Sequence, residues 1–178
     1  TTSMSASGEL PRCLESLRCV RGLGHIIVLV IAEPAIENKA ASKIRAVAEQ
    51  FPDLNIAVVG APEMALVRQR MEQRNEVGLA GYGAMRNLGL LLAGALDFDS
   101  VVFVDDDVVI DDPAFLEKAM YGLGKLTRSG VPILAKSGFY LNKEGEYLSS
   151  RSTKWYNRYW DQATAFNKWI SKAMKGPR

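Results

Sequence analysis

Apolar residues along the chain alternate between helical spacing and the nearly continuous runs of buried strands. HIIVLVIA at 25–32 and NIAVVG at 55–60 suit parallel strands covered on both faces. A helical stripe precedes each of them, and helices that alternate with strands predict an α/β fold. The two stripes are Leu10, Cys13, Leu14 and Leu17, and then Ala40, Ile44, Val47, Ala48 and Phe51.

The middle of the chain repeats this pattern. Segment 63–76 is rich in Arg, Gln and Glu and predicts a short exposed helix or an insertion. GYGAMRNLGLLLAGAL at 81–96 opens with glycines and predicts a helix, and SVVFVD at 100–105 predicts a third strand. Asp112 and Pro113 are typical of the start of a further helix. The residues expected to be buried on the helix at 81–96 are Met85, Leu88, Leu92 and Leu96.

The pattern changes in the last third of the chain, which we expect to form an extension at 131–178. VPILAKSGFYL, a turn-like NKEG and EYL predict a hairpin or an addition to the sheet. The final helix carries aromatics too densely for one buried stripe, so we expect it to contact a missing acceptor-side half or another subunit, with a membrane surface as the second choice. The alternative is that both faces are buried within this domain, with the preceding hairpin folded over one side. Those aromatics are Trp155, Tyr156, Tyr159, Trp160, Phe166 and Trp169.

Composition limits the class of protein without naming it. A chain of 178 residues is long enough for one domain, which we expect to span 1–178. Hydrophobic residues make up 48% and charged residues 24% of the sequence, which is typical of globular proteins. A net charge of +2 gives no reason to expect nucleic acid. Cys13 and Cys19 point to different faces of a helix, which argues against a disulfide. No apolar run reaches the roughly 18 residues of a membrane span, so we expect a cytoplasmic protein, free or peripheral at the inner membrane face.

Three aspartates, Asp105, Asp106 and Asp107, follow the predicted strand at 100–105 directly. Like charges this close disfavour one another's ionised form unless a cation neutralises them. In an extended chain Asp105 and Asp107 project to the same side, where they can share Mn²⁺ or Mg²⁺, which prefer carboxylate oxygens. Asp111 and Asp112 are instead explained as capping residues.

A second candidate site lies in GYGAMRNLGL, at the start of the helix expected at 81–96. Glycines such as Gly83 let a ligand approach the backbone closely. Arg86 falls in the first helical turn, where free amides favour an anion and its guanidinium can pair with a phosphate at two points. The alternative is an exposed arginine beside Asn87, whose side chain bonds locally.

In order and in motif, these pieces resemble the donor-binding half of family 2-like glycosyltransferases of the GT-A fold. ELPRCLESL is similar to the family's first helix, HIIVLVIA and NIAVVG to its second and third strands, and GYGAMRNLGLLLAGAL to its glycine-containing segment and small-residue helix. VVFVDDDVVI resembles the strand that ends in the Asp-X-Asp metal motif. The resemblance covers 7–126 and implies a three-layer Rossmann-like sheet with helices on both faces, incomplete at one or both ends.

The resemblance also implies roles for individual residues. Asp105 would contact the ribose or sugar of a nucleotide-diphosphate-sugar donor, and Asp107 would bind a divalent metal, Mn²⁺ or Mg²⁺, that bridges the diphosphate. Asp106 takes the variable middle position of the motif. Arg86 would approach the diphosphate, with Asn87 and Gly83 shaping the turn. The expected activity is transfer of a sugar, typically a hexose, to an acceptor.

Several family features have no clear counterpart here. TTSMSAS matches at most the tail of the family's first strand, and Glu33 in AEPAIE is the nearest candidate for its nucleotide-contacting aspartate. Glu144, Glu146 and Asp161 match no motif, so no general base is assigned. Two alternative functions therefore remain. The chain could be a non-catalytic module that binds a nucleotide sugar or a partner, or it could be a sugar-1-phosphate nucleotidyltransferase. GLGKLT lacks the spacing of a nucleoside triphosphatase loop.

Overall fold

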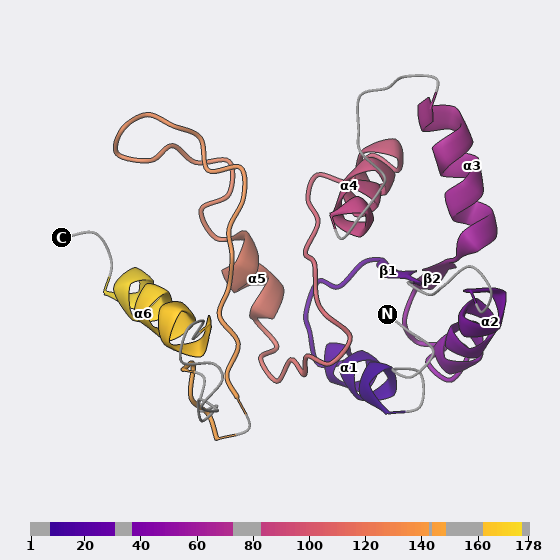
Figure 1. Ribbon diagram of the computed structural model, residues 1–178, viewed down its shortest axis with the longest axis horizontal. Helices are drawn as coiled ribbons and strands as arrows, with labels where there is room; N and C mark the ends of the chain where they lie inside the picture. The colour runs from indigo at the N-terminus through magenta and orange to yellow at the C-terminus, as the bar shows by residue number, and fades with distance from the viewer. Residues whose placement is uncertain (1–7, 31–36, 73–82, 143, 149–161, 176–178) are drawn as a thin grey trace. The chain divides into compact units, whose positions relative to one another are not determined.

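The computed structural model describes residues 8–30, 37–72, 83–142, 144–148 and 162–175 (Figure 1). The chain forms two compact units, Thr1–Gly122 and Leu123–Arg178. Both candidate motifs of the sequence, around Arg86 and around Asp105, belong to the first unit.

Helix α1 (Glu9–Leu17) forms where the first apolar stripe predicts it. Its four stripe residues are all buried, because spacings of three and four positions place them on one helical face. Pro11 lies in the first turn, where the missing N–H costs no helical hydrogen bond. The residues of this face are Leu10, Cys13, Leu14 and Leu17.

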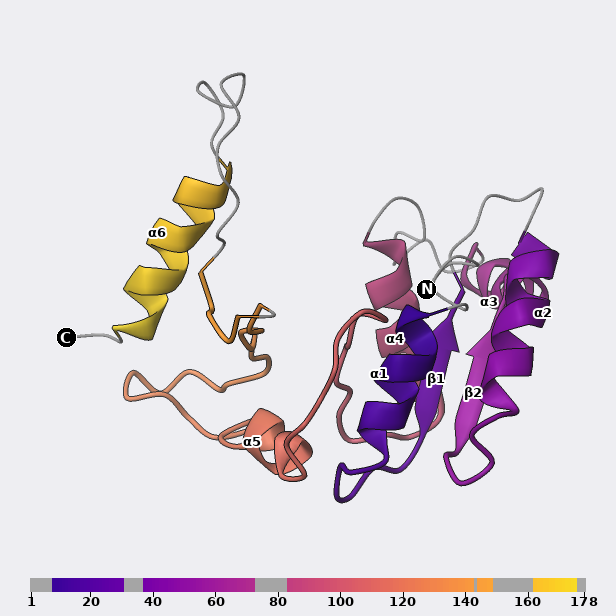
Figure 2. The same cartoon turned by 90° about the horizontal axis from the view of Figure 1, so that it is seen from below.

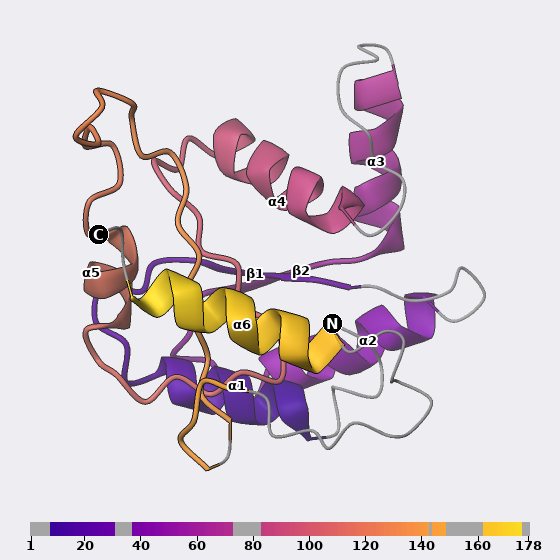
Figure 3. The same ribbon diagram turned by 60° about the vertical axis from the view of Figure 1, so that its left-hand side comes forward.

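Two short parallel strands, β1 (Ile26–Leu29) and β2 (Ile56–Val59), form the sheet, with Ile26 opposite Ile56. Helix α2 (Glu37–Ala48) connects them and supplies the second predicted stripe. Figures 1 and 3 show α1 and α2 on one face of the strands and α4 on the other. The predicted α/β class is confirmed. The larger three-layer Rossmann-like sheet stays a prediction, because the sheet of the described residues has two strands.

The third predicted strand is not formed, since residues 101–104 pair with neither β1 nor β2. The chain is attached to α1 further along instead, where the Ile110 N–H donates to Ser16 Oγ at 3.0 Å and the Arg21 N–H donates to the Pro113 carbonyl at 2.9 Å. These bonds hold the segment against α1 rather than against the edge of β1. The apolar residues Val101, Phe103 and Val104 consequently stay more than a third exposed.

Three more helices complete the first unit: α3 (Ala61–Glu72), α4 (Ala84–Ala95) and α5 (Phe115–Met120). In α4, Leu88 is buried as predicted, and Met85 and Leu92 are partly buried. Leu96 was expected to be buried but is 56% exposed, because the helix ends at Ala95. The carboxylate of Asp112 accepts a hydrogen bond from the Ala114 N–H at 2.9 Å, so it caps the turn that precedes α5.

In the second unit the predicted hairpin is replaced by an earlier turn. The Thr127 N–H donates to the Val131 carbonyl at 2.8 Å, and Leu126 bridges Pro132 in antiparallel orientation. Asn142 also forms a turn with Glu146, but among the described residues no strands flank it. The final helix, α6, spans Gln162–Met174.

Candidate functional site

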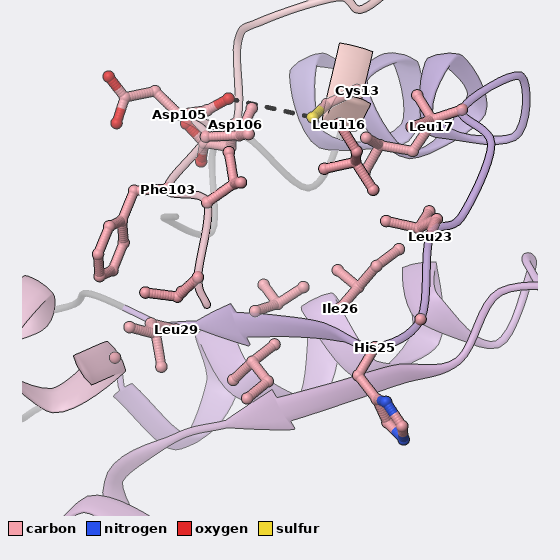
Figure 4. A pocket seen from close by; sticks show the side chains of 18 of the residues that line it. Cys13, Leu17, Leu23, His25, Ile26, Leu29, Phe103, Asp105, Asp106 and Leu116 are labelled. Carbon is pink, nitrogen blue, oxygen red and sulfur yellow. Dashed lines mark hydrogen bonds between the residues drawn. The ribbon is translucent and has the colours of Figure 1, made fainter. Parts of the chain in front are cut away.

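A groove of about 800 Å³ lies in the first unit, between β1 and the segment that follows α4. Figure 2 shows this segment passing β1 on the side away from β2. Helices α1 and α4 contribute further walls, and Asp105 and Asp106 lie at one end (Figure 4). Asp107 is also among the lining residues. The groove is mostly apolar, with its charged residues gathered at the aspartate end together with Arg86.

The two candidate motifs meet at this end of the groove. Arg86 Nη2 lies 3.9 Å from Asp105 Oδ1, although 18 residues separate the two positions in the sequence. Both side chains are more than half exposed, at 53% and 73%. An exposed pair at that distance contributes little to folding stability.

The geometry of the aspartates differs from the alternation expected in an extended chain. The chain turns at Asp106 and Asp107, and the Val108 N–H donates to the Asp105 carbonyl at 3.2 Å. Strand alternation therefore does not place Asp105 and Asp107 on one side, contrary to the prediction, because alternation holds only in an extended strand. The carboxylates of Asp105 and Asp107 are exposed, whereas Oδ2 of Asp106 is buried.

Cys13 of α1 lies beside the aspartate turn, a neighbour that sequence reasoning missed. Its thiol approaches the Asp105 carbonyl oxygen at 4.0 Å (Figure 4). Burial, and to a smaller extent the negative charges of Asp106 and Asp107, raises the pKa of Cys13 to about 11. The thiol stays protonated at neutral pH and serves as a buried neutral neighbour of the acidic turn. The position of Cys13 in the apolar stripe of α1 predicted that its side chain is buried, but it did not predict that the aspartate turn lies beside it.

Gly83 and Asn87 lie at the start of α4, as predicted. Gly83 is the residue before the helix, and its carbonyl accepts a hydrogen bond from the Asn87 N–H at 3.0 Å. The helix has no side-chain cap there. Arg86 lies in the first turn of the same helix.

The aspartate turn offers two exposed acidic residues, Asp105 and Asp107, as the residues to compare with a metal site. Among the described residues, no three His, Cys, Asp or Glu side chains converge as a closed metal site. Mg²⁺ commonly takes one or two carboxylates and completes its shell with phosphate oxygens and water. Asp105 and Asp107, both exposed, are the residues that would hold Mn²⁺ or Mg²⁺ in that way.

The remaining candidates belong to the second unit or lie outside the described residues. Glu33 and Asp161 fall outside, as do four of the six aromatics of the 155–169 segment. Phe166 and Trp169 are described in α6, where they are 38% and 59% exposed. None of the described helices has both the length and the apolar character needed to cross a bilayer.

Comparisons of this chain with protein-family models, with curated proteins and with solved structures found no match.

Proposed function

We propose that this chain binds the diphosphate of a nucleotide-sugar donor with Mn²⁺ or Mg²⁺ and transfers the sugar to an acceptor. The observation that carries the proposal is the contact of the two motifs at one end of the groove, with Arg86 3.9 Å from Asp105. A cationic side chain and carboxylates at one site match a ligand that is itself an anion accompanied by a metal.

Each residue has a distinct part in this proposal. Arg86 and the first amides of α4 bind the phosphate oxygens, because a guanidinium can donate to two of them at once. Asp105 orients the ribose or the sugar by accepting hydrogen bonds from hydroxyl groups. Asp107, with Asp105, holds the metal. Once bound, the metal would offset the negative charge that develops on the departing diphosphate.

Calorimetry with a nucleoside diphosphate tests this binding site. We expect tight binding with Mn²⁺ and at least about tenfold weaker binding with chelator, because the phosphates and carboxylates then repel one another. Asp107→Ala should abolish the effect of the metal. Asp111→Ala is the matched control, since Asp111 is exposed but does not line the groove. Equal affinity with metal and with chelator would contradict the proposal.

The role of Arg86 is tested by a change that keeps its charge. Arg86→Lys should weaken nucleotide binding about tenfold, because an ammonium cannot reproduce the two-point contact of the guanidinium. An unchanged affinity would mean that Arg86 only pairs with Asp105.

Turnover separates a transferase from a binding module. Incubation with a panel of nucleotide sugars and Mn²⁺ should release the nucleoside diphosphate, by transfer or by slow hydrolysis. A chain that binds these donors tightly and releases no diphosphate would be a non-catalytic nucleotide-sugar-binding module. Release of pyrophosphate from a nucleoside triphosphate and a sugar phosphate would instead identify a nucleotidyltransferase.

A further inference from the structure

Charge is divided unequally between the two units of the chain. The second unit, Leu123–Arg178, contains 11 Lys and Arg residues against three Asp and Glu residues, so its formal net charge is +8. The first unit, Thr1–Gly122, contains 11 basic and 17 acidic residues, so its formal net charge is −6. The total of +2 hides this difference. A basic part in an otherwise acidic chain is typical of proteins that bind an anionic surface.

Helix α6 carries part of this positive charge and has two different apolar faces. One face is buried, since Ile170 is 3% exposed and Ala163 and Asn167 beside it are partly buried. Phe166 and Trp169 are centred about a third of a turn away, where they are 38% and 59% exposed. The packing of α6 therefore uses the face of Ile170 and leaves the two aromatic side chains accessible.

Three exposed lysines accompany these aromatics. Lys168 and Lys172 are four positions apart, which places them in one row along α6, and Lys175 follows directly after the helix. Segment 162–175 contains no Asp or Glu in its sequence, so the helix itself offers no carboxylate that would offset this charge. A basic row beside exposed Trp and Phe is typical of helices that lie in a membrane interface, where the long lysine side chains reach the headgroups.

The apolar surface of α6 decides which anionic partner fits. Single-stranded nucleic acid is typically bound in a basic groove, with its bases stacked on aromatic side chains. The accessible surface of α6 is instead a strip along a helix, in which Phe166, Trp169 and Ala173 follow one another at spacings of three and four positions. Such a strip can enter a flat apolar boundary along its whole length, so a lipid surface suits it better than a chain of bases.

We propose that α6 binds the surface of a membrane that contains anionic lipids. Phe166 and Trp169 enter the boundary of the acyl chains, and Lys168 and Lys172 lie at the level of the lipid phosphates. At 13 residues, α6 is shorter than the roughly 20 residues of a membrane span, so it lies in the plane of the surface. The proposal goes beyond the transferase function, because α6 belongs to the second unit and the diphosphate site to the first.

Flotation of the whole chain with lipid vesicles tests the proposal. The vesicles are phosphatidylcholine with about 30% phosphatidylserine, compared with phosphatidylcholine alone. We expect at least about tenfold tighter binding to the anionic vesicles, because each lysine near such a surface contributes about fivefold in affinity. Higher salt should weaken this binding, since it screens the charges. Equal binding to both kinds of vesicle, or to neither, would overturn the proposal.

Variants of the aromatic side chains test the apolar contact. Trp169→Ala should weaken binding to the anionic vesicles at least about tenfold, because the indole then no longer leaves water. Its exposure of 59% means that the change removes little packing within the chain. Leu66→Ala is the matched control, at an apolar residue of α3 that is 61% exposed, and should bind as the parent does. Unchanged binding of Trp169→Ala would overturn the proposal.

Variants of the lysines test the charged row. Lys168→Gln combined with Lys172→Gln should weaken binding to the anionic vesicles about thirtyfold. The matched control combines Lys39→Gln with Lys43→Gln, at two exposed lysines of α2 that are also four positions apart, and alters the net charge equally. This control should bind nearly as the parent does. Equal losses in both double variants would show a response to net charge and overturn the assignment to α6.

Two further measurements test the rival partners, a nucleic acid and a second copy of the chain. Binding of a single-stranded oligonucleotide that displaces the vesicles and survives Trp169→Ala would assign the lysines to nucleic acid and overturn the proposal. A dimer in sedimentation that separates in Trp169→Ala would overturn it in favour of self-association. A monomer that floats only with anionic vesicles supports it. Because no arm contains a nucleotide sugar or a metal ion, failure here is distinct from failure of the proposed transferase function.

Discussion

The apolar residues on the two sides of strand β1 are of similar types but differ in how completely they are buried. On the β2 side, α2 covers the strands with Ala40, Ala41 and Ile44, each at most 1% exposed. On the groove side, Phe103 rests against Gly89 of α4 and stays 41% exposed. The run at 101–104 thus differs from the paired strands, because it has neither a strand partner among the described residues nor buried side chains. The following changes test this contrast between the β2 side and the groove side, beginning with the largest expected effect.

Truncation of one apolar side chain on each side should give unequal losses of stability. Ile44→Ala should lower the free energy of unfolding by about 3 kcal/mol, because the fully buried site loses apolar contact and gains a cavity. Phe103→Ala should cost less than about 1 kcal/mol, because much of that ring already meets solvent. Urea unfolding followed by circular dichroism measures both. Similar losses would show that the groove side is as well packed as the β2 side.

Thiol labelling asks whether the groove opens to solvent. At pH 8, Cys19, which is exposed, should react with a maleimide, while Cys13 should react at least about a hundredfold more slowly. Burial and the nearby aspartates raise the pKa of Cys13 to about 11, so little thiolate forms, and raising the pH toward that value should accelerate the reaction. Cys13→Ser and Cys19→Ser variants assign the two rates. Equal rates at pH 8 would mean that the groove opens readily.

Most of the first unit was predicted from the sequence, because its helices and strands follow local rules. The stripe of α1 and the runs at β1 and β2 each identify an element from their own residues. The prediction of a third strand was wrong because a strand also needs a partner far away in the sequence. The run VVFV shows a preference for strand structure, but it does not show whether the edge of another strand lies close enough to pair with it. Likewise the two motifs around Arg86 and Asp105 indicated charged residues, while their contact depends on how α4 packs.

Glycines on the two sides should tolerate a methyl group differently. At Gly60 a Cβ would lie 3.0 Å from Cβ of Ala41, which is fully packed, so Gly60→Ala should cost about 1–2 kcal/mol. At Gly89 it would lie 2.6 Å from Cε1 of Phe103, whose exposed ring can move aside. The gain in helix propensity, about 1 kcal/mol, then offsets most of the cost of Gly89→Ala. Thermal unfolding checks both, and a larger loss at Gly89 would contradict this view.

The smallest expected effect concerns an exposed ion pair next to the β2 side. Arg18 donates to both carboxylate oxygens of Asp53, at 2.8 and 2.7 Å, and these hydrogen bonds lower the pKa of Asp53. An aspartate whose pKa is lowered on folding stabilises the folded state at pH values above the ordinary pKa of aspartate. This contribution is lost as the pH falls through the pKa that the group has in the folded state. Asp53→Asn should therefore destabilise the chain slightly at pH 7.

The pH dependence of that effect is the informative measurement. The difference between Asp53→Asn and the parent chain in urea midpoint should shrink as the pH falls toward about 3. Asp99→Asn is a suitable control, because Asp99 is exposed and is not in this pair. A difference that stays constant with pH would assign the role of Asp53 to something other than its charge.

The bonds that hold residues 110–113 to α1 also set an order of folding. The Ile110 N–H donates to Ser16 Oγ across 94 positions of the chain, and Cys19 Sγ approaches the Ile110 carbonyl across 91. Closing so long a loop costs conformational entropy before any contact compensates for it. The two strands and α2 make contacts over much shorter separations, so we expect them to assemble first. We then expect the aspartate turn, and with it the charged end of the groove, to take its place late in folding, on a surface that the first half of the chain has already formed.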